Sequence, residues 1–216
     1  MDAGPWSLAS RGTVYVSGLK DYYETLWSRL PVGLTLPDLE RRRRFLVSEL
    51  RPEDRVLDLG CGEGTFAAYA IEAGTAAVLA ADVAEAALVR AASAHPQLDL
   101  RLVPFCGPLP FEDCSFDLVW ASEVIEHVAD TAAWLSEVRR VLAPRGRLLL
   151  TTPSHGRLRL LAGGIERYSE PLGDHLHLYT ARSLRGLLSE FGFDPVMVIA
   201  AGPPLARRLL LARGTR

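Results

Sequence analysis

The chain has 216 residues and a mass of 23.6 kDa, with 49% hydrophobic and 23% charged residues. This composition is typical of a globular protein with one core of ordinary size, and it excludes a disordered or coiled-coil chain. The net charge of −2 and the isoelectric point near 6.2 argue against a global positive field that would attract nucleic acid or an anionic membrane.

Residues 1–50 are predicted to form an N-terminal helical appendage, and residues 51–216 one α/β domain. Tyr22, Tyr23 and Trp27 are grouped in the appendage, ahead of a break that runs from Pro31 to Pro37. From residue 51 on, short apolar runs alternate with helical stretches, a pattern typical of βαβ units and a mostly parallel sheet. Strands are predicted at 55–60, 76–82, 98–103, 116–120 and 147–152, and helices at 64–73, 84–94 and 123–142.

The last quarter of the chain is less regular. Residues 153–179 are rich in Gly, His and Arg and are predicted to form an irregular insertion. Thr180 is expected to cap a helix that Gly192 ends. The apolar runs 196–200 and 205–212 are predicted to be two closing strands.

Three cysteines, Cys61, Cys106 and Cys114, form no C-x-x-C pair, so neither a disulfide framework nor a structural zinc site is expected. The first residues lack the basic start and apolar run of a signal peptide. No stretch approaches the roughly 18 apolar residues that a membrane helix needs. A cytoplasmic protein without membrane association is therefore expected.

Residues 56–66 carry the clearest functional pattern. An apolar strand leads into Gly60, Gly62 and Gly64 at alternate positions and then into a helix. Glycine is needed where φ is positive or where a ligand touches the main chain, and open α/β sheets bind ligands at the carboxyl end of such a strand. Asp82 ends the next strand about 20 residues further on, where an acid can bind ribose hydroxyls.

The glycine spacing is G-x-G-x-G, whereas dinucleotide-binding loops have G-x-G-x-x-G. Asp58 and Glu63 add negative charge beside the loop. They would repel a pyrophosphate but suit a ligand with an ammonium or sulfonium group. The sequence has no G-x-x-x-x-G-K-[ST] loop, so ATP hydrolysis is not expected.

Residues 58–64 resemble motif I of the class I S-adenosylmethionine-dependent methyltransferases. Residues 109–119 are similar to the family's segment before and within strand four, and 123–128 to the start of its next helix. Residues 139–152 and 177–193 also resemble this family, particularly its small-molecule, type 11 and ubiquinone-pathway-like branch. The resemblance implies a Rossmann-like, doubly wound, mostly parallel seven-stranded sheet with an N-terminal helical lid, and S-adenosylmethionine as cofactor.

The same resemblance implies a set of cofactor-binding residues. The glycine loop would lie against the methionine part with Asp58 supporting it, Asp82 would bind the ribose diol, and Val83 would flank the adenine. Ser122 would border the methyl end. Relatives often have an Asp where this chain has Phe105, so adenine is expected to stack on Phe105 and to bond to backbone around Cys106. The implied residues are Asp58, Gly60, Gly62, Gly64, Asp82, Val83, Phe105, Cys106 and Ser122.

Glu123, Glu126 and His127 are spaced i, i+3 and i+4, so a helix would place them on one face. With a further histidine they could hold a divalent metal, as in metal-dependent relatives. The favoured alternative is that the acids complement the helix dipole and His127 is packed or solvated. No metal is therefore expected.

His155, His175 and His177 fall in the irregular segment where relatives build part of the acceptor pocket. A neutral histidine is a candidate general base, and His127 and His155 are the candidates named here. The alternative is that these histidines are packed near Tyr179. His155, His175 or His177 could also supply the further metal ligand beside Glu123, Glu126 and His127.

The four arginines 41–44 would point in all directions from a helix, which favours a solvated surface over a contact with RNA or an acidic substrate. Tyr22, Tyr23 and Trp27 either fasten the appendage to the domain or close the active site.

The predicted function is methyl transfer from S-adenosylmethionine to an O or N nucleophile of a small-molecule acceptor. Three alternatives remain open: a metal-dependent RNA 2′-O-methyltransferase, a nicotinamide-binding protein with the same sheet, and a protein that binds the cofactor without transfer. The acidic charge argues against the first and the glycine spacing against the second. No motif identifies the acceptor or the oligomeric state.

Overall fold

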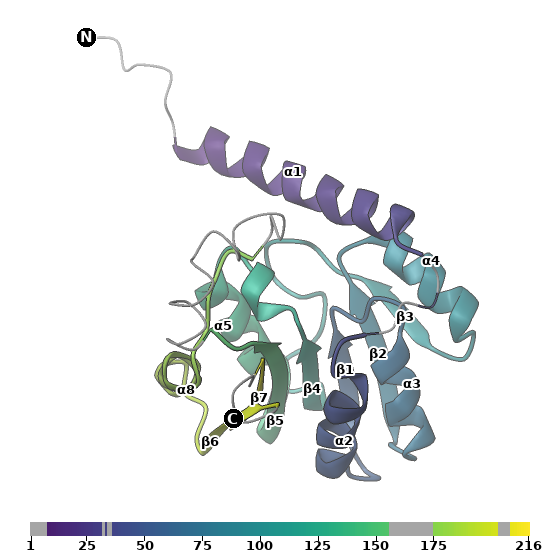
Figure 1. Ribbon diagram of the computed structural model, residues 1–216, viewed down its shortest axis with the longest axis vertical. Coiled ribbons are helices and arrows are strands. Elements are labelled where there is room, and N and C mark those ends of the chain that lie inside the picture. The colour runs from purple at the N-terminus through teal and green to yellow at the C-terminus, as the bar shows by residue number, and fades with distance from the viewer. Residues whose placement is uncertain (1–7, 32, 34–35, 156–174, 203–207) are drawn as a thin grey trace.

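The computed structural model describes residues 8–31, 33, 36–155, 175–202 and 208–216. Helices and strands alternate along most of the chain, as predicted (Figure 1). In chain order they are α1 (Leu8–Arg29), α2 (Leu39–Glu49), β1 (Arg55–Leu59), α3 (Thr65–Glu72), β2 (Ala77–Asp82), α4 (Glu85–Ala94), β3 (Asp99–Leu102), β4 (Phe116–Ser122), η1 (Ile125–His127), α5 (Thr131–Val141), β5 (Leu142–Pro153), α8 (Ala181–Glu190), β6 (Val196–Ala201) and β7 (Leu209–Thr215).

The strands form one seven-stranded sheet in the order β3-β2-β1-β4-β5-β7-β6. Strands β1 to β5 pair in parallel, whereas β7 is antiparallel to both β5 and β6. The register places Leu57 of β1 opposite Leu79 of β2 and Val119 of β4. The predicted doubly wound, mostly parallel sheet is confirmed, and the strand order reverses direction between β1 and β4.

Helices cover both faces of this sheet: α2, α3 and α4 lie on one side, α5 and α8 on the other (Figure 1). Successive residues of β4 point to opposite faces of the sheet and belong to the two hydrophobic clusters there. Val119 belongs to the cluster that includes α5 and α8, and Trp120 to the one that includes α2 and α3. The Trp120 ring lies 6.2 Å from Phe45 and 5.1 Å from Phe66 between ring centroids. Burial on both faces explains why β4 is nearly uniformly apolar.

The single helix predicted over 123–142 is wrong. A 3₁₀ turn, η1, is followed by an extended Val128, with φ −78° and ψ 115°, and α5 starts only at Thr131. The Asp130 side chain caps α5 by accepting a hydrogen bond from the Ala133 N–H at 2.9 Å. An Asp at this position favours the start of a new helix. The apolar spacing alone did not reveal the break between η1 and α5.

The predicted helix and two closing strands of the C-terminal part are confirmed, with one shift in position. Thr180 caps α8 in a reciprocal pair of hydrogen bonds with Ser183, and Gly192 follows the helix with φ +76°. The last strand is Leu209–Thr215 and continues past the predicted end at 212, because β7 pairs with β5 as far as Arg147 opposite Thr215. Residues 205–207 of the predicted strand lie outside the described residues. Most of the predicted insertion at 153–179 lies outside the described residues.

The N-terminal part has two helices, α1 before Pro31 and α2 after Pro37. In Figure 1, α1 crosses above the carboxyl ends of the strands, and it contacts α4. Within the described part of the chain, no helix has both the length and the apolar character that crossing a membrane requires.

Candidate functional site

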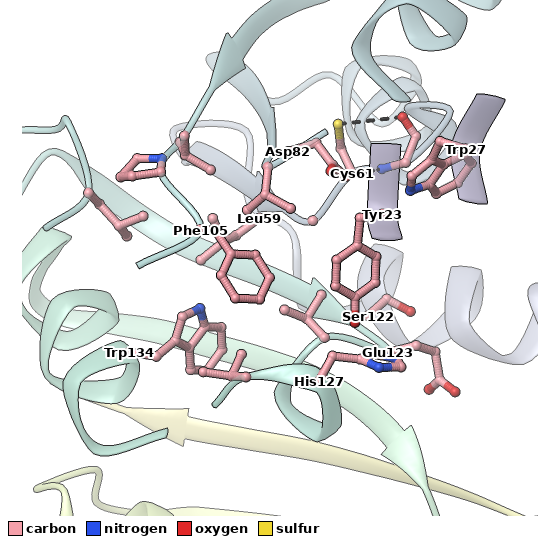
Figure 2. Close-up of a pocket in the computed structure, with 18 of the residues that line it drawn as sticks. Tyr23, Trp27, Leu59, Cys61, Asp82, Phe105, Ser122, Glu123, His127 and Trp134 are labelled. Carbon is pink, nitrogen blue, oxygen red and sulfur yellow. Dashed lines mark hydrogen bonds between the residues drawn. The ribbon is translucent and has the colours of Figure 1, made fainter. Parts of the chain in front are cut away.

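A cavity of about 550 Å³ lies at the carboxyl ends of β1, β2 and β4, underneath α1 (Figure 2). The loops that follow β1, β2, β3 and β4 line it together with the start of α5, while Tyr23, Leu26 and Trp27 of α1 cover it. Open α/β sheets bind ligands at this edge, where the strand order reverses. The carboxylates that line the cavity belong to Glu63, Asp82, Glu123, Asp130 and Glu137.

The glycine loop forms part of the cavity wall. Gly60 and Gly62 line it with φ +82° and +54°, and the N–H groups of Gly60 and Cys61 donate to the Ala81 carbonyl at 2.7 and 3.0 Å. A Cβ on Gly60 would lie 2.5 Å from a Val124 methyl group, and one on Gly62 would lie 2.7 Å from the Trp27 ring. Both positions therefore exclude side chains by backbone conformation and by space.

Gly64 does not line the cavity. A Cβ there would lie 2.5 Å from a Leu98 methyl group, so this glycine allows α3 to pack closely against the chain before β3. Asp58 is also outside the cavity lining and is 2% exposed. Burial raises the pKa of Asp58 to about 7, against the opposing hydrogen bond from the Ala67 backbone N–H.

Asp82 joins the glycine loop to the end of β2. One carboxylate oxygen accepts a hydrogen bond from the Gly62 N–H at 2.9 Å and the other from the Ala84 N–H at 3.0 Å. The residue is 5% exposed yet lines the cavity, and burial raises its pKa while the two N–H groups lower it. Each oxygen retains a further lone pair that can accept a hydrogen bond from a ligand.

Aromatic side chains also line the cavity. Phe105 and Tyr23 are stacked, with ring centroids 6.0 Å apart and 30° between ring planes, and Figure 2 shows them facing each other beside Trp134. Val83 and Cys106 also line the cavity. Flat aromatic surfaces of this kind suit a planar ring in the ligand.

Ser122 ends β4 at the cavity, where its hydroxyl is 2.9 Å from the Thr151 hydroxyl. Glu123 follows with φ +58°, accepts a hydrogen bond from Thr151 at 2.9 Å, and lies 3.6 Å from the Arg42 guanidinium. Burial raises the pKa of Glu123, and the positive charge of Arg42 opposes this. Because Glu123 is in a left-handed turn rather than a helix, it does not share a face with Glu126 and His127 as predicted.

Glu126 instead points into the protein, fully buried, and accepts a hydrogen bond from the Thr152 hydroxyl at 2.9 Å. Burial raises the pKa of Glu126 to about 8, and the nearby Glu123 adds to this. Potential ligand atoms of Glu126, His127 and His175 lie within 4.8 Å of one another. His127 also lines the cavity, with its ring 6.0 Å from that of Tyr23.

Among the described residues, the other histidines are not part of the cavity lining. His155 is 1% exposed, and its Nδ1 accepts a hydrogen bond from the Tyr179 N–H at 3.1 Å, which fixes the proton of the neutral ring on Nε2. Its position gives no support to the prediction that it acts as a base. His177 Nε2 is 3.0 Å from the Val128 carbonyl.

The run of arginines was predicted to be a solvated surface, and for Arg42 this is wrong. Arg42 is 5% exposed and lines the cavity, whereas Arg41 and Arg44 are exposed. Arg42 lies three residues after Leu39 and four before Leu46, which both belong to the core under α2. This helical spacing was visible in the sequence and could have identified Arg42 as inward-facing.

Two charged residues fasten α1 over the cavity. The Glu24 carboxylate accepts hydrogen bonds from the first backbone N–H groups of α4, those of Glu85 at 2.7 Å and Ala86 at 3.0 Å. Arg90 of α4 donates to the last carbonyls of α1, including Trp27 at 2.8 Å, and also to Glu63 of the glycine loop at 2.8 Å. Its guanidinium lies 5.7 Å from the Trp27 ring centroid.

Comparison with known proteins identifies the class of protein that this fold and site define. A family model described as "Methyltransferase domain" matches residues 34–198. The chain therefore belongs to this family, within the class I S-adenosylmethionine-dependent methyltransferases, and the predicted family and cofactor are confirmed.

Individual relatives refine this picture. The chain is 34% identical over 171 residues to a "Probable S-adenosylmethionine-dependent methyltransferase" of Mycobacterium tuberculosis, covering 75% of this chain and 60% of that protein. It is 36% identical over 112 residues to a malonyl-[acyl-carrier protein] O-methyltransferase of Erwinia billingiae, covering 52% and 44%. The chain thus spans about half the length of these relatives.

A solved S-adenosylmethionine-dependent methyltransferase of Mesorhizobium loti has the same fold. Its TM-score is 0.62 at 24% identity, and the match covers 79% of this chain and 95% of that chain. At this identity the likeness concerns the fold alone.

Proposed function

We propose that this protein transfers the methyl group of S-adenosylmethionine to an O or N nucleophile of a small-molecule acceptor in the cavity under α1. One observation carries the proposal: Asp82 and the glycine loop are hydrogen-bonded to each other in the wall of a cavity at the switch point of the sheet. This arrangement leaves carboxylate lone pairs and main-chain surface facing a ligand.

The residues that line the cavity fit the parts of this cofactor. The Asp82 carboxylate would accept hydrogen bonds from the ribose hydroxyls, and Phe105 and Val83 would flank the adenine. Gly60 and Gly62 would border the methionine part and Ser122 the methyl end. The lining carboxylates also complement the cofactor's sulfonium and ammonium charges.

Bound S-adenosylmethionine supplies a methyl group already activated by its sulfonium. The chain then has to align the acceptor, and such positioning is worth about 7–11 kcal/mol of the barrier. Of the described histidines, His127 lines the cavity, and in its neutral form it would remove a proton from an acceptor that is protonated at neutral pH. One relative is named for O-methylation of a malonyl group, which fits an oxygen nucleophile.

A small acceptor fits both the size and the charge of the site. The cavity of about 550 Å³ falls in the range of small-molecule pockets. The net charge of −2 and the acidic lining would disfavour a nucleic acid backbone. A cytoplasmic location and the division into residues 1–50 and 51–216 remain predictions.

We further propose that α1 acts as a lid over the bound cofactor. Trp27 lies against Gly62, and Arg90 joins the end of α1 to Glu63 in the same loop. Arg90→Gln would remove these charge-assisted bonds and accelerate release of S-adenosylhomocysteine about tenfold or more, measured by stopped-flow tryptophan fluorescence. Arg101→Gln, at an exposed arginine of β3, is the control. An unchanged release rate in Arg90→Gln would refute the lid.

The methyl transfer itself is tested by following formation of S-adenosylhomocysteine with a panel of small alcohols, phenols, carboxylic acids and amines. Turnover with one of these classes, lost in Asp82→Ala, is the expected result. Binding of the cofactor without turnover on any acceptor would favour a non-catalytic cofactor-binding protein.

A further inference from the structure

Arg42 stands out in the charge pattern of the cavity. Among the described residues that line it, Arg42 is the one lysine or arginine, and the carboxylates of Glu63, Asp82 and Glu123 lie in the same lining. A buried guanidinium carries a permanent charge that is costly unless it is paired. Arg42 is therefore expected to need an anionic group within hydrogen-bonding distance of its guanidinium.

The hydrogen-bonding capacity of Arg42 is poorly used. One terminal nitrogen lies 3.4 Å from the Ser122 hydroxyl and the other 3.6 Å from the Glu123 carboxylate. Both separations exceed the roughly 2.7–2.9 Å of a normal charge-assisted hydrogen bond. Its buried Nε has no hydrogen-bond partner among the residues that the structure describes. A guanidinium has five N–H donors in one plane, so most of this fork is available to a ligand.

The other arginines of α2 differ in this respect. Arg41 is paired with Asp38, and Arg43 and Arg44 with Glu40, all on the outside of the helix. Asp38 immediately precedes α2, and Glu40 is in its first turn. The inward face of α2 therefore presents one guanidinium to the cavity without a closely bonded acid.

We propose that Arg42 binds a carboxylate in the cavity, next to Ser122. This inference rests on the proposed function, and it names a binding residue that the sequence analysis did not include in the site. Two molecules could bring the carboxylate: the cofactor, whose amino-acid tail carries its one carboxylate, or an acidic acceptor. The planar guanidinium can bind either carboxylate through two parallel hydrogen bonds, whereas a lysine ammonium cannot form such a pair.

Calorimetry with two nucleosides tests whether the carboxylate that Arg42 binds is that of the cofactor. S-adenosylhomocysteine carries the amino-acid tail, whereas 5′-methylthioadenosine has the same adenine, ribose and thioether without it. For Arg42→Gln the affinity for S-adenosylhomocysteine should fall about 10- to 150-fold. The affinity for 5′-methylthioadenosine should stay the same. Arg42→Lys should give an intermediate loss. Arg44→Gln, at an exposed arginine of α2, should bind both nucleosides as the wild type does.

The second arm tests an acidic acceptor. If S-adenosylhomocysteine binds Arg42→Gln normally, malonate is titrated into protein saturated with S-adenosylhomocysteine. Binding to the wild type but not to Arg42→Gln then assigns Arg42 to the acceptor's carboxylate. Melting curves of all variants establish that they are folded.

Two results would overturn the inference. In one, Arg42→Gln and Arg42→Lys bind both nucleosides and malonate like the wild type. In the other, the two nucleosides lose affinity by the same factor, which indicates a purely structural role. Failure of the wild type to bind either nucleoside would instead refute the proposed function, so the two failures are distinguishable.

Discussion

Replacing Asp82 should both destabilise the fold and weaken cofactor binding. Its two carboxylate oxygens accept hydrogen bonds from the N–H groups of Gly62 and Ala84, at 2.9 and 3.0 Å. Asp82→Ala leaves both donors without an acceptor in a site where Asp82 itself is 5% exposed. Each buried unsatisfied donor costs about 1–3 kcal/mol, so the free energy of unfolding should fall by about 2–6 kcal/mol.

Urea unfolding followed by circular dichroism measures this loss. Asp82→Asn keeps one acceptor oxygen and should fall between wild type and Asp82→Ala. Asp117→Ala is the control, because Asp117 also accepts a backbone N–H, that of Arg55 at 3.0 Å, together with the Arg55 guanidinium at 2.8 Å, but in an exposed setting. A loss for Asp82→Ala no larger than that of the control would refute the reasoning. Where Asp82→Asn remains folded, its affinity for S-adenosylhomocysteine should fall by about 1.5–3 kcal/mol.

Other predictions can be tested by the same unfolding and binding measurements. Gly64→Ala should cost about 2–4 kcal/mol of unfolding free energy, because its Cβ would lie 2.5 Å from a Leu98 methyl group. Gly74→Ala, at φ +82° with open space around it, should cost only the 1–2 kcal/mol or so of backbone strain, and equal losses would contradict the packing role. Burial raises the pKa of Asp58 from 3.8 to about 7, so the folded protein binds more protons than the unfolded chain between these values and stability should fall as pH rises through them. Asp58→Asn should flatten that slope in urea unfolding, and an unchanged slope would contradict it. Chelation with EDTA should leave the affinity for S-adenosylhomocysteine unchanged; a loss that Glu126→Gln reproduces would instead establish a metal at that cluster.

The sheet was predictable because its signals are local. Apolar runs with glycine or aspartate at their ends predicted β1 to β4 to within two residues, whereas β5 begins at Leu142, five residues before its predicted start. Strands β1, β2 and β4 surround the cavity. The break before α5 was missed because a turn that buries Ile125 keeps the apolar spacing of a helix. A capping aspartate at 130 was the available signal.

The site was predicted less completely, since it depends on contacts between distant segments. The roles of Gly62 and Gly64 differ because one faces Trp27 and the other Leu98, and loop spacing carries no such information. Arg42 was hidden in a run of like residues, although its helical spacing from Leu39 and Leu46 marked it as inward-facing.

The bonds that hold α1 were not foreseeable from local pattern. Glu24 and Arg90 are far apart in sequence, and each finds backbone groups at the end of the other's helix. Neither residue type is unusual on a helix surface.

The central claim is that the cavity under α1 binds S-adenosylmethionine rather than a nicotinamide dinucleotide. Calorimetric titration with S-adenosylhomocysteine and, separately, with NADH tests it most directly. The structure predicts one-to-one binding of S-adenosylhomocysteine, weakened in Asp82→Asn, and no binding of NADH. Binding of NADH without binding of S-adenosylhomocysteine would contradict the claim.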